Sequence, residues 1–141
     1  MSQTSIPPEQ RLIVALDVPS ATEARALVTE IGDAVNFYKV GLELFTGADG
    51  FGIVDWLTGQ KKNVFVDLKF FDVPATVGRA VSQLQGRGIT FATVHGNDAM
   101  MKAAADAADG VGILAVTVLT SLDKADMLDL GFDCDIPELV C

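Results

Sequence analysis

Residues 64–77 read Val-Phe-Val-Asp-Leu-Lys-Phe-Phe-Asp-Val-Pro-Ala-Thr-Val, and this stretch decides the fold. Its first part, Val64–Lys69, is a short β-branched and aromatic run, which predicts a buried strand. Pro74 suits the first turn of a helix, because its missing N–H would have no partner there. The apolar residues that follow lie at near-helical intervals: Val73, Val77, Val81 and Leu84. A strand followed directly by a helix is the repeating unit of parallel α/β sheets.

The same unit recurs on both sides of this stretch. Further strands are expected at residues 12–16, 37–40, 91–95 and 113–119. Helices are expected after a Ser20 cap as far as Gly32, around 53–57, from Asn97 to about Ala108, and from Ser121 or Asp123 towards Leu130. Residues 135–141 read like the opening of another helix. Five such units predict a parallel α/β sheet, and both a doubly wound sheet and a (β/α)₈ barrel fit the alternation.

Composition excludes several classes of partner. The formal charge of −9 repels nucleic acid and anionic membrane surfaces at long range. No apolar run approaches the roughly 20 residues of a membrane span, and the polar N-terminus lacks the layout of a signal peptide. The spacing of Cys134 and Cys141 fits no common zinc pattern, which favours two reduced thiols. We therefore expect a soluble cytoplasmic protein.

Charged side chains interrupt the apolar runs near the ends of the predicted strands. They are Asp17, Lys39, Asp67, Lys69 and His95. The carboxyl ends of parallel strands are where α/β proteins bind their ligands. The recurrence of charge at these positions, and hardly anywhere else in the strands, predicts a functional site there.

The pattern Asp67-x-Lys69-x-x-Asp72 is the most informative part of that site. Side chains alternate along a strand, so Asp67 and Lys69 are expected on one face. Neighbouring carboxylates favour the ammonium form of a lysine, which makes Lys69 a candidate proton donor. Two structural alternatives stay open: Asp72 caps the next helix, or Asp67 and Lys69 are only an ion pair that closes the sheet end.

Five ordered blocks carry a resemblance to a known family. They are Ala15–Asp17, Tyr38–Gly41, Val66–Val77, Val94–Gly96 and Val118–Ser121. From about Arg11 to about Gly131 the chain resembles orotidine 5′-phosphate decarboxylase, the last enzyme of de novo pyrimidine synthesis. The resemblance implies a homodimer of (β/α)₈ barrels that uses neither a metal ion nor an organic cofactor. On this basis residues 1–10 form an N-terminal tail and residues 11–141 a partial barrel domain with about the first five βα units.

The resemblance also implies roles for the charged residues. Lys39, Asp67, Lys69 and Asp72 match the family's alternating charged network, and Lys69 matches the lysine that protonates C6 of the pyrimidine as carbon dioxide leaves. Asp67 is then expected near the carboxylate of the nucleotide substrate. Asp72 is expected to reach into the partner subunit's site.

The contacts to the rest of the nucleotide follow in the same way. Asp17 and Lys39 match residues that contact the ribose hydroxyls, and Thr76 matches a contact made across the dimer. Thr120 and Ser121 match positions of the fifth strand near the pyrimidine edge. His95 is interpreted as a hydrogen-bonded wall residue, and Gly47-x-x-Gly50-x-Gly52 as a turn, because its spacing fits no nucleotide-binding loop.

Two alternative functions remain. Magnesium-dependent sugar-phosphate decarboxylases and hexulose-phosphate synthases resemble this family in the same block, but they place an acidic metal ligand where this chain has Lys39. A dimerising fragment without catalytic activity is the second alternative. A full barrel has eight units in about 250 residues. The resemblance implies that the phosphate is bound at the last two strands, beyond these five units, so we expect little or no activity from residues 1–141 alone.

Overall fold

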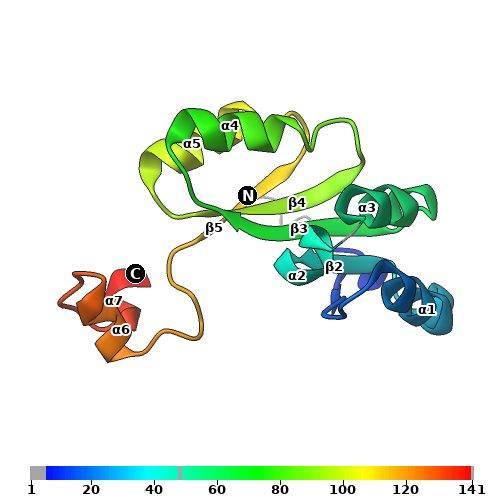
Figure 1. Ribbon diagram of the computed structural model, residues 1–141, viewed down its shortest axis with the longest axis horizontal. Coiled ribbons are helices and arrows are strands. Elements are labelled where there is room, and N and C mark those ends of the chain that lie inside the picture. Colours follow the sequence, from blue (N-terminus) through cyan, green and yellow to red (C-terminus); the bar gives the residue numbers. More distant parts are fainter. Residues whose placement is uncertain (1–5, 48, 141) are drawn as a thin grey trace.

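The computed structural model describes residues 6–47 and 49–140, which form a five-stranded parallel sheet with flanking helices (Figure 1). The strands are β1 (Val14–Ala15), β2 (Phe37–Gly41), β3 (Asn63–Phe70), β4 (Ile89–His95) and β5 (Gly112–Val116). They lie in the order β1-β2-β3-β4-β5 without reversal. A doubly wound sheet reverses its order at a switch point, whereas a barrel wall does not. The predicted α/β class is confirmed, and the strand order is that of a barrel.

Helices connect successive strands, as the sequence predicted. The helical elements are η1 (Pro8–Gln10), α1 (Ala21–Ile31), η2 (Gly32–Ala34), α2 (Leu42–Thr46), α3 (Gly50–Gly59), α4 (Pro74–Ser82), α5 (Asp98–Asp106), α6 (Lys124–Asp129) and α7 (Ile136–Val140). The Ser20 hydroxyl accepts from the Glu23 N–H at the start of α1, and the Asn97 side chain caps α5. Of the two caps expected for α6, Asp123 takes the role. These caps satisfy backbone N–H groups that the helix itself leaves unpaired.

The two faces of the sheet differ in what they carry. The helix-covered face is formed by Tyr38, Val40, Val64, Val66, Ala92 and Val94, each with 0% exposure, and these residues pack in one apolar cluster with side chains of α1, α3, α4 and α5. The open face is formed by Phe37, Lys39, Phe65, Asp67, Phe91 and Thr93, which the strand registers place opposite. All four helices therefore cover the same face, as they do outside a barrel.

On the open face, aromatic rings occupy the strand positions just before the polar residues, nearer the amino ends of the strands. The ring of Phe91 lies 5.9 Å from that of Phe37 and 6.3 Å from that of Phe65, centroid to centroid. On the next strand a Cβ at Gly112 would lie 2.5 Å from the Phe91 ring, so glycine is needed for this packing. The polar groups therefore lie beside a layer of packed aromatic rings, which forms an apolar boundary on their amino-terminal side.

Some predicted boundaries were wrong. The first strand covers only Val14–Ala15, and the fifth ends at Val116 rather than Leu119. Both are edge strands with one neighbour. The pairing of β5 stops at Val116 because β4 ends at His95, whereas beyond β1 the Leu16 N–H still donates to the Lys39 carbonyl at 2.9 Å. The predicted turn at Gly47–Gly52 was also wrong in part, because Gly50 lies in α3. A Cβ at Gly50 would lie 1.9 Å from the Phe45 carbonyl oxygen, so the glycine permits close packing of α3 on α2.

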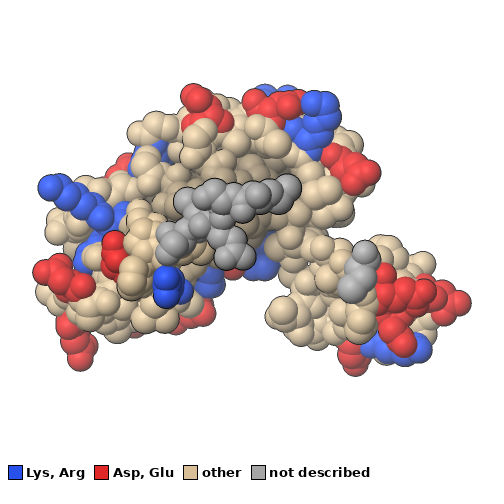
Figure 2. All heavy atoms as spheres, turned by 180° about the vertical axis from the view of Figure 1, so that it is seen from behind, with Lys and Arg blue, Asp and Glu red and all other residues tan. Residues whose placement is uncertain are grey.

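The C-terminal α6–α7 segment stands apart from the sheet and is joined to it by an extended stretch (Figure 1). The main apolar cluster contains no residue beyond Ile113 in the described part of the chain. Acidic side chains gather on this segment (Figure 2), and Lys124 Nζ pairs with Asp135 Oδ1 at 3.0 Å. Across residues 6–47 and 49–140, no helix has the length and apolar character needed to cross a membrane.

Candidate functional site

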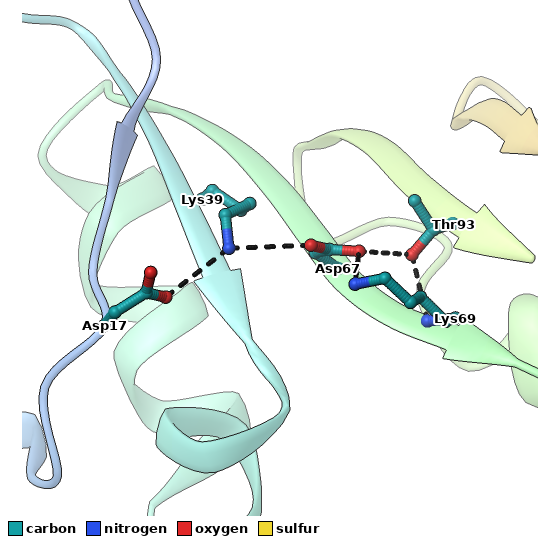
Figure 3. Close-up of polar contacts among 5 residues, drawn as sticks. All are labelled: Asp17, Lys39, Asp67, Lys69 and Thr93. Atoms are coloured by element: carbon teal, nitrogen blue, oxygen red, sulfur yellow. Dashed lines mark hydrogen bonds and ion pairs between the residues drawn. The ribbon is translucent and has the colours of Figure 1, made fainter. Parts of the chain in front are cut away.

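Four of the predicted charged residues converge near the carboxyl ends of the strands (Figure 3). Asp17 follows β1, Lys39 lies in β2, and Asp67 and Lys69 lie in β3. Their side chains all reach the open face of the sheet, although they come from segments far apart in the sequence. The parallel registers of β1, β2 and β3 bring them together, as strand-end placement predicts.

The side chains form a line of alternating charge. Lys39 Nζ lies 3.4 Å from Asp17 Oδ1 and 3.5 Å from Asp67 Oδ2, and Lys69 Nζ lies 2.8 Å from Asp67 Oδ1. The Asp67 side chain is 12% exposed, whereas that of Asp17 is 70% exposed. Two cations and two anions cancel in net charge, so the inner members tolerate burial that none would tolerate alone.

The backbone at Lys69 is not a regular strand. Lys69 has a positive φ of 49°, and the β3–β4 register shifts between Val66 and Phe70. The predicted shared face is nevertheless confirmed, because Asp67 and Lys69 line the same hollow while Leu68 packs against the apolar cluster behind the sheet. The irregular backbone occurs at the residue whose ammonium group lies 2.8 Å from Asp67 Oδ1, and bulges of this kind are common at functional sites.

Thr93 of β4 joins the cluster, and the sequence analysis did not identify it. Its hydroxyl accepts from the Lys69 backbone N–H at 2.9 Å and donates to Asp67 Oδ1 at 2.9 Å. Thr93 is 4% exposed and is the only buried polar residue within the described ranges. The available signal was a hydroxyl in the middle of an apolar run, where a buried polar group needs partners.

Electrostatics favour the ionised form of Asp67. Burial is the largest single influence and raises the pKa of this carboxyl, but it is outweighed by hydrogen bonds from Lys69 and Thr93 and by the charges of Lys69 and Lys39. The net result is a pKa below the ordinary value of 3.8. Asp67 therefore remains an acceptor and a negative charge at neutral pH.

Asp72 lies outside the cluster of its own chain. Its side chain is exposed, and Oδ1 accepts from the Val73 N–H at 2.7 Å. The helix-cap alternative is not supported, because the N-cap of α4 is Val73. Thr76, within α4, accepts from Arg79 at 3.1 Å. Neither residue touches the Lys69 ammonium group in the described chain, so their roles across a dimer stay predictions.

A hollow of about 470 Å³ lies next to the charged line. Its lining residues are Phe65, Asp67, Lys69, Thr93, Val116, Val118, Leu119, Thr120 and Ser121. Thr120 and Ser121 thus lie near Lys69, but in a turn after β5 rather than in the strand as predicted. An ammonium group, a carboxylate and hydroxyls beside apolar walls are suited to hold a polar ring and to move a proton at one point on it.

Two further side chains define what surrounds the cluster. The His95 imidazole packs edge-on against the Phe71 ring, with centroids 5.0 Å apart, and it does not line the hollow, so a hydrogen-bonded wall role stays a prediction. The Lys39 ammonium group occupies the space between the carboxylates of Asp17 and Asp67. A cation at this position repels a divalent metal ion.

Comparison with known proteins places the chain in a family. Residues 10–137 match the sequence profile of the orotidine 5′-phosphate decarboxylase / HUMPS family. The chain belongs to this family. The orotidine 5′-phosphate decarboxylase of Methylococcus capsulatus is 64% identical over 140 residues, covering 99% of this chain and 58% of that protein. The enzyme of that name from Bradyrhizobium sp. (strain ORS 278) is 49% identical over 139 residues, covering 97% of this chain and 57% of that protein.

Solved structures agree with the family assignment. The crystal structure of orotidine 5′-phosphate decarboxylase from Lactobacillus acidophilus superimposes with a TM-score of 0.83 at 36% identity, covering 93% of this chain and 63% of that one. The family resemblance inferred from the sequence blocks is thus confirmed. The predicted barrel type of the fold is confirmed for this chain as well. The chain spans a little over half the length of the curated relatives it matches.

Proposed function

We propose that the complete protein containing this chain decarboxylates orotidine 5′-phosphate to uridine 5′-phosphate in pyrimidine synthesis, without a metal ion or an organic cofactor. The observation that carries the proposal is the Lys69 ammonium group, held 2.8 Å from Asp67 beside a hollow at the carboxyl end of the sheet. Family membership and the names of close relatives support it. A cytoplasmic location stays a prediction.

The proposed chemistry needs one well-placed proton. The bond between C6 of the pyrimidine and its carboxylate breaks, carbon dioxide leaves, and the electron pair stays on C6. Lys69 Nζ donates a proton that forms the C6–H bond, and the resulting amine regains its proton from solvent. An ammonium group aimed at C6 stabilises charge that develops only as the reaction proceeds, which accelerates the chemical step.

The other members of the site receive supporting roles. Asp67, which bonds the ammonium group, lies near the substrate carboxylate and orients Lys69. Lys39 and Asp17 bind the ribose hydroxyls, consistent with the exposure of Asp17 at the outer end of the charged line. Thr120 and Ser121, which line the hollow beside Lys69, contact the pyrimidine edge.

A homodimer would complete the site through Asp72 and Thr76. Asp72 lies between Phe71, which is 72% exposed, and Val73, which is 63% exposed. Two exposed large apolar side chains around an acidic residue favour a protein interface here. We propose that Asp72 of each subunit joins the charged network of the other, with Thr76 making a contact across the same interface.

The activity is tested by the fall in orotidine 5′-phosphate ultraviolet absorbance with the complete gene product. We expect turnover that persists after chelation of divalent metal. A strict requirement for magnesium, with turnover of a sugar phosphate instead, would establish the alternative enzyme class. Residues 1–141 assayed alone are predicted to show little or no turnover, and a normal rate would contradict that prediction.

Mixing two inactive variants tests the shared site. Lys69→Ala and Asp72→Ala remove residues that would come from different subunits of one site. A hybrid dimer then holds one intact site, so random mixing restores up to about a quarter of the parental activity. If both residues act within one subunit, mixing restores nothing.

A further inference from the structure

The two neighbours of the Thr93 hydroxyl determine which hydrogen bond it accepts and which it donates. The Lys69 backbone N–H, 2.9 Å away, is only a donor, so the hydroxyl oxygen must accept from it. The single hydroxyl proton is then directed to Asp67 Oδ1, also at 2.9 Å. This arrangement requires Asp67 Oδ1 to accept, and the ionised carboxylate meets that requirement.

The same hydroxyl connects the two parts of the site that depart most from regular strand geometry. The Lys69 N–H belongs to the residue with a φ of 49°, where the β3–β4 ladder loses its register. Without Thr93, this N–H would have no strand carbonyl in register to receive it. The hydroxyl therefore replaces a ladder bond at the bulge and holds the backbone that carries Lys69.

Both oxygens of Asp67 are thereby assigned. Oδ1 receives Lys69 Nζ and the Thr93 hydroxyl, and Oδ2 faces Lys39 Nζ at 3.5 Å. The groups around this carboxylate are thus Lys39 from β2, Lys69 from β3 and Thr93 from β4, with Asp17 beyond Lys39. His95, the remaining titratable group on β4, faces Phe71 instead.

We propose that Thr93 is a positioning residue, whose hydroxyl fixes the bulged backbone of Lys69 and the rotation of the Asp67 carboxylate together, so that the Lys69 ammonium group points at one place in the hollow. The consequence for the reaction rests on the proposed decarboxylase function. The positioning itself does not, because it is a property of three side chains and one backbone N–H in this chain. A misplacement of about 1 Å in such a group costs roughly 100-fold in rate.

The first test measures Asp67 directly, whatever the protein catalyses. The Asp67 carboxyl carbon is followed by NMR during a pH titration of the complete gene product and its variants. Thr93→Val has nearly the same shape but no hydroxyl, so we expect the Asp67 pKa to rise. Thr93→Ser retains the hydroxyl and should titrate like the parent. Thr90→Val on the same strand is the control, since within the described residues no hydrogen bond joins the Thr90 side chain to Asp67 or Lys69.

A Thr93→Val protein that titrates like the parent would overturn the proposal. Should that variant not fold, Thr93→Cys replaces it, because a thiol of similar size is a much weaker hydrogen-bond partner. An upward pKa shift in Thr93→Cys but not in Thr93→Ser supports the proposal. Equal titration of the two variants contradicts it.

The second test separates positioning from substrate binding. In Thr93→Val we expect kcat to fall on the order of 10-fold or more, with KM changed less than about 3-fold, and Thr93→Ser to recover most of kcat. A loss confined to KM would contradict positioning. If the parent does not turn over orotidine 5′-phosphate, the proposed function fails while the NMR titration still decides the role of Thr93.

Discussion

The two faces of the same five strands follow opposite rules. On the helix-covered face the strand side chains are apolar and fully buried against four helices. The open face carries a layer of packed aromatic rings, formed by Phe37, Phe65 and Phe91. The charged cluster lies next to this layer, towards the carboxyl ends of the strands. The first face stabilises the fold through apolar burial, whereas the second carries partly buried charges whose desolvation costs stability.

The comparison teaches where function can be placed in such a sheet. A charge on the helix-covered face would be surrounded by hydrocarbon on every side and would lose its hydration without a partner. On the open face Lys39, Asp67 and Lys69 neutralise each other and keep access to the hollow. Variants on the two faces should therefore separate activity from stability.

The largest separation is expected at Lys69. In the complete protein, Lys69→Met should lower kcat/KM for orotidine 5′-phosphate by about 10³-fold, roughly 4 kcal/mol, because the proton donor is lost. The thermal midpoint should change little, since the Lys69 side chain is 38% exposed. Lys102→Met on α5 is the matched control, because among the described residues this lysine pairs with Asp106 alone, on the surface. Equal activity of the two variants would contradict the assignment.

The reverse pattern is expected for the helix-covered face. Leu57 of α3 is 0% exposed in the apolar cluster. Leu57→Ala should lower the free energy of unfolding by about 3 kcal/mol, through lost burial and the cavity left behind. Activity per folded molecule should stay within about 3-fold, as judged by denaturant titration and assay of the same samples. A large loss of kcat without loss of stability would show that the two faces are coupled.

A smaller effect is expected where α3 packs on α2. Gly50→Ala forces a methyl group against the Phe45 carbonyl and should destabilise the protein by about 2 kcal/mol. Gly59→Ala, at the other end of α3, adds a methyl group with nothing within 4 Å and should stabilise by about 0.5 kcal/mol. Thermal melts of the pair measure the difference. Equal shifts would mean that α3 does not pack on α2 in this way.

The smallest effect concerns pH and the open face alone. Because the folded-state pKa of Asp67 is below its ordinary value of 3.8, its ionised form contributes stability that is fully present above that value. The contribution is lost as the pH falls through the lower folded-state pKa. Unfolding free energies measured between about pH 5 and pH 2 should fall less steeply for Asp67→Asn than for the parent. Parallel curves would contradict the shift.

The sequence alone determined the alternation of elements and the position of the charges. Apolar runs with a period of two or none, followed by capped helical patterns, depend on local chemistry and can be read without neighbours. Asp17, Lys39, Asp67 and Lys69 stand out for the same reason, because charge in a buried run is locally conspicuous. The family resemblance in Val66–Val77 added the expected chemistry, and the profile match over residues 10–137 confirmed the family.

Tertiary structure decided the features that need two segments at once. The ends of β1 and β5 depend on whether a neighbouring strand pairs with them, and the glycine at residue 50 depends on how closely α2 approaches. The bulge at Lys69 and the role of Thr93 arise together, because the hydroxyl matters only once β4 lies beside an irregular β3. A sequence pattern does not specify how far the Thr93 hydroxyl lies from Lys69 on the neighbouring strand. A threonine in an apolar strand is therefore not recognisable as part of the site until the fold brings its hydrogen-bond partners close.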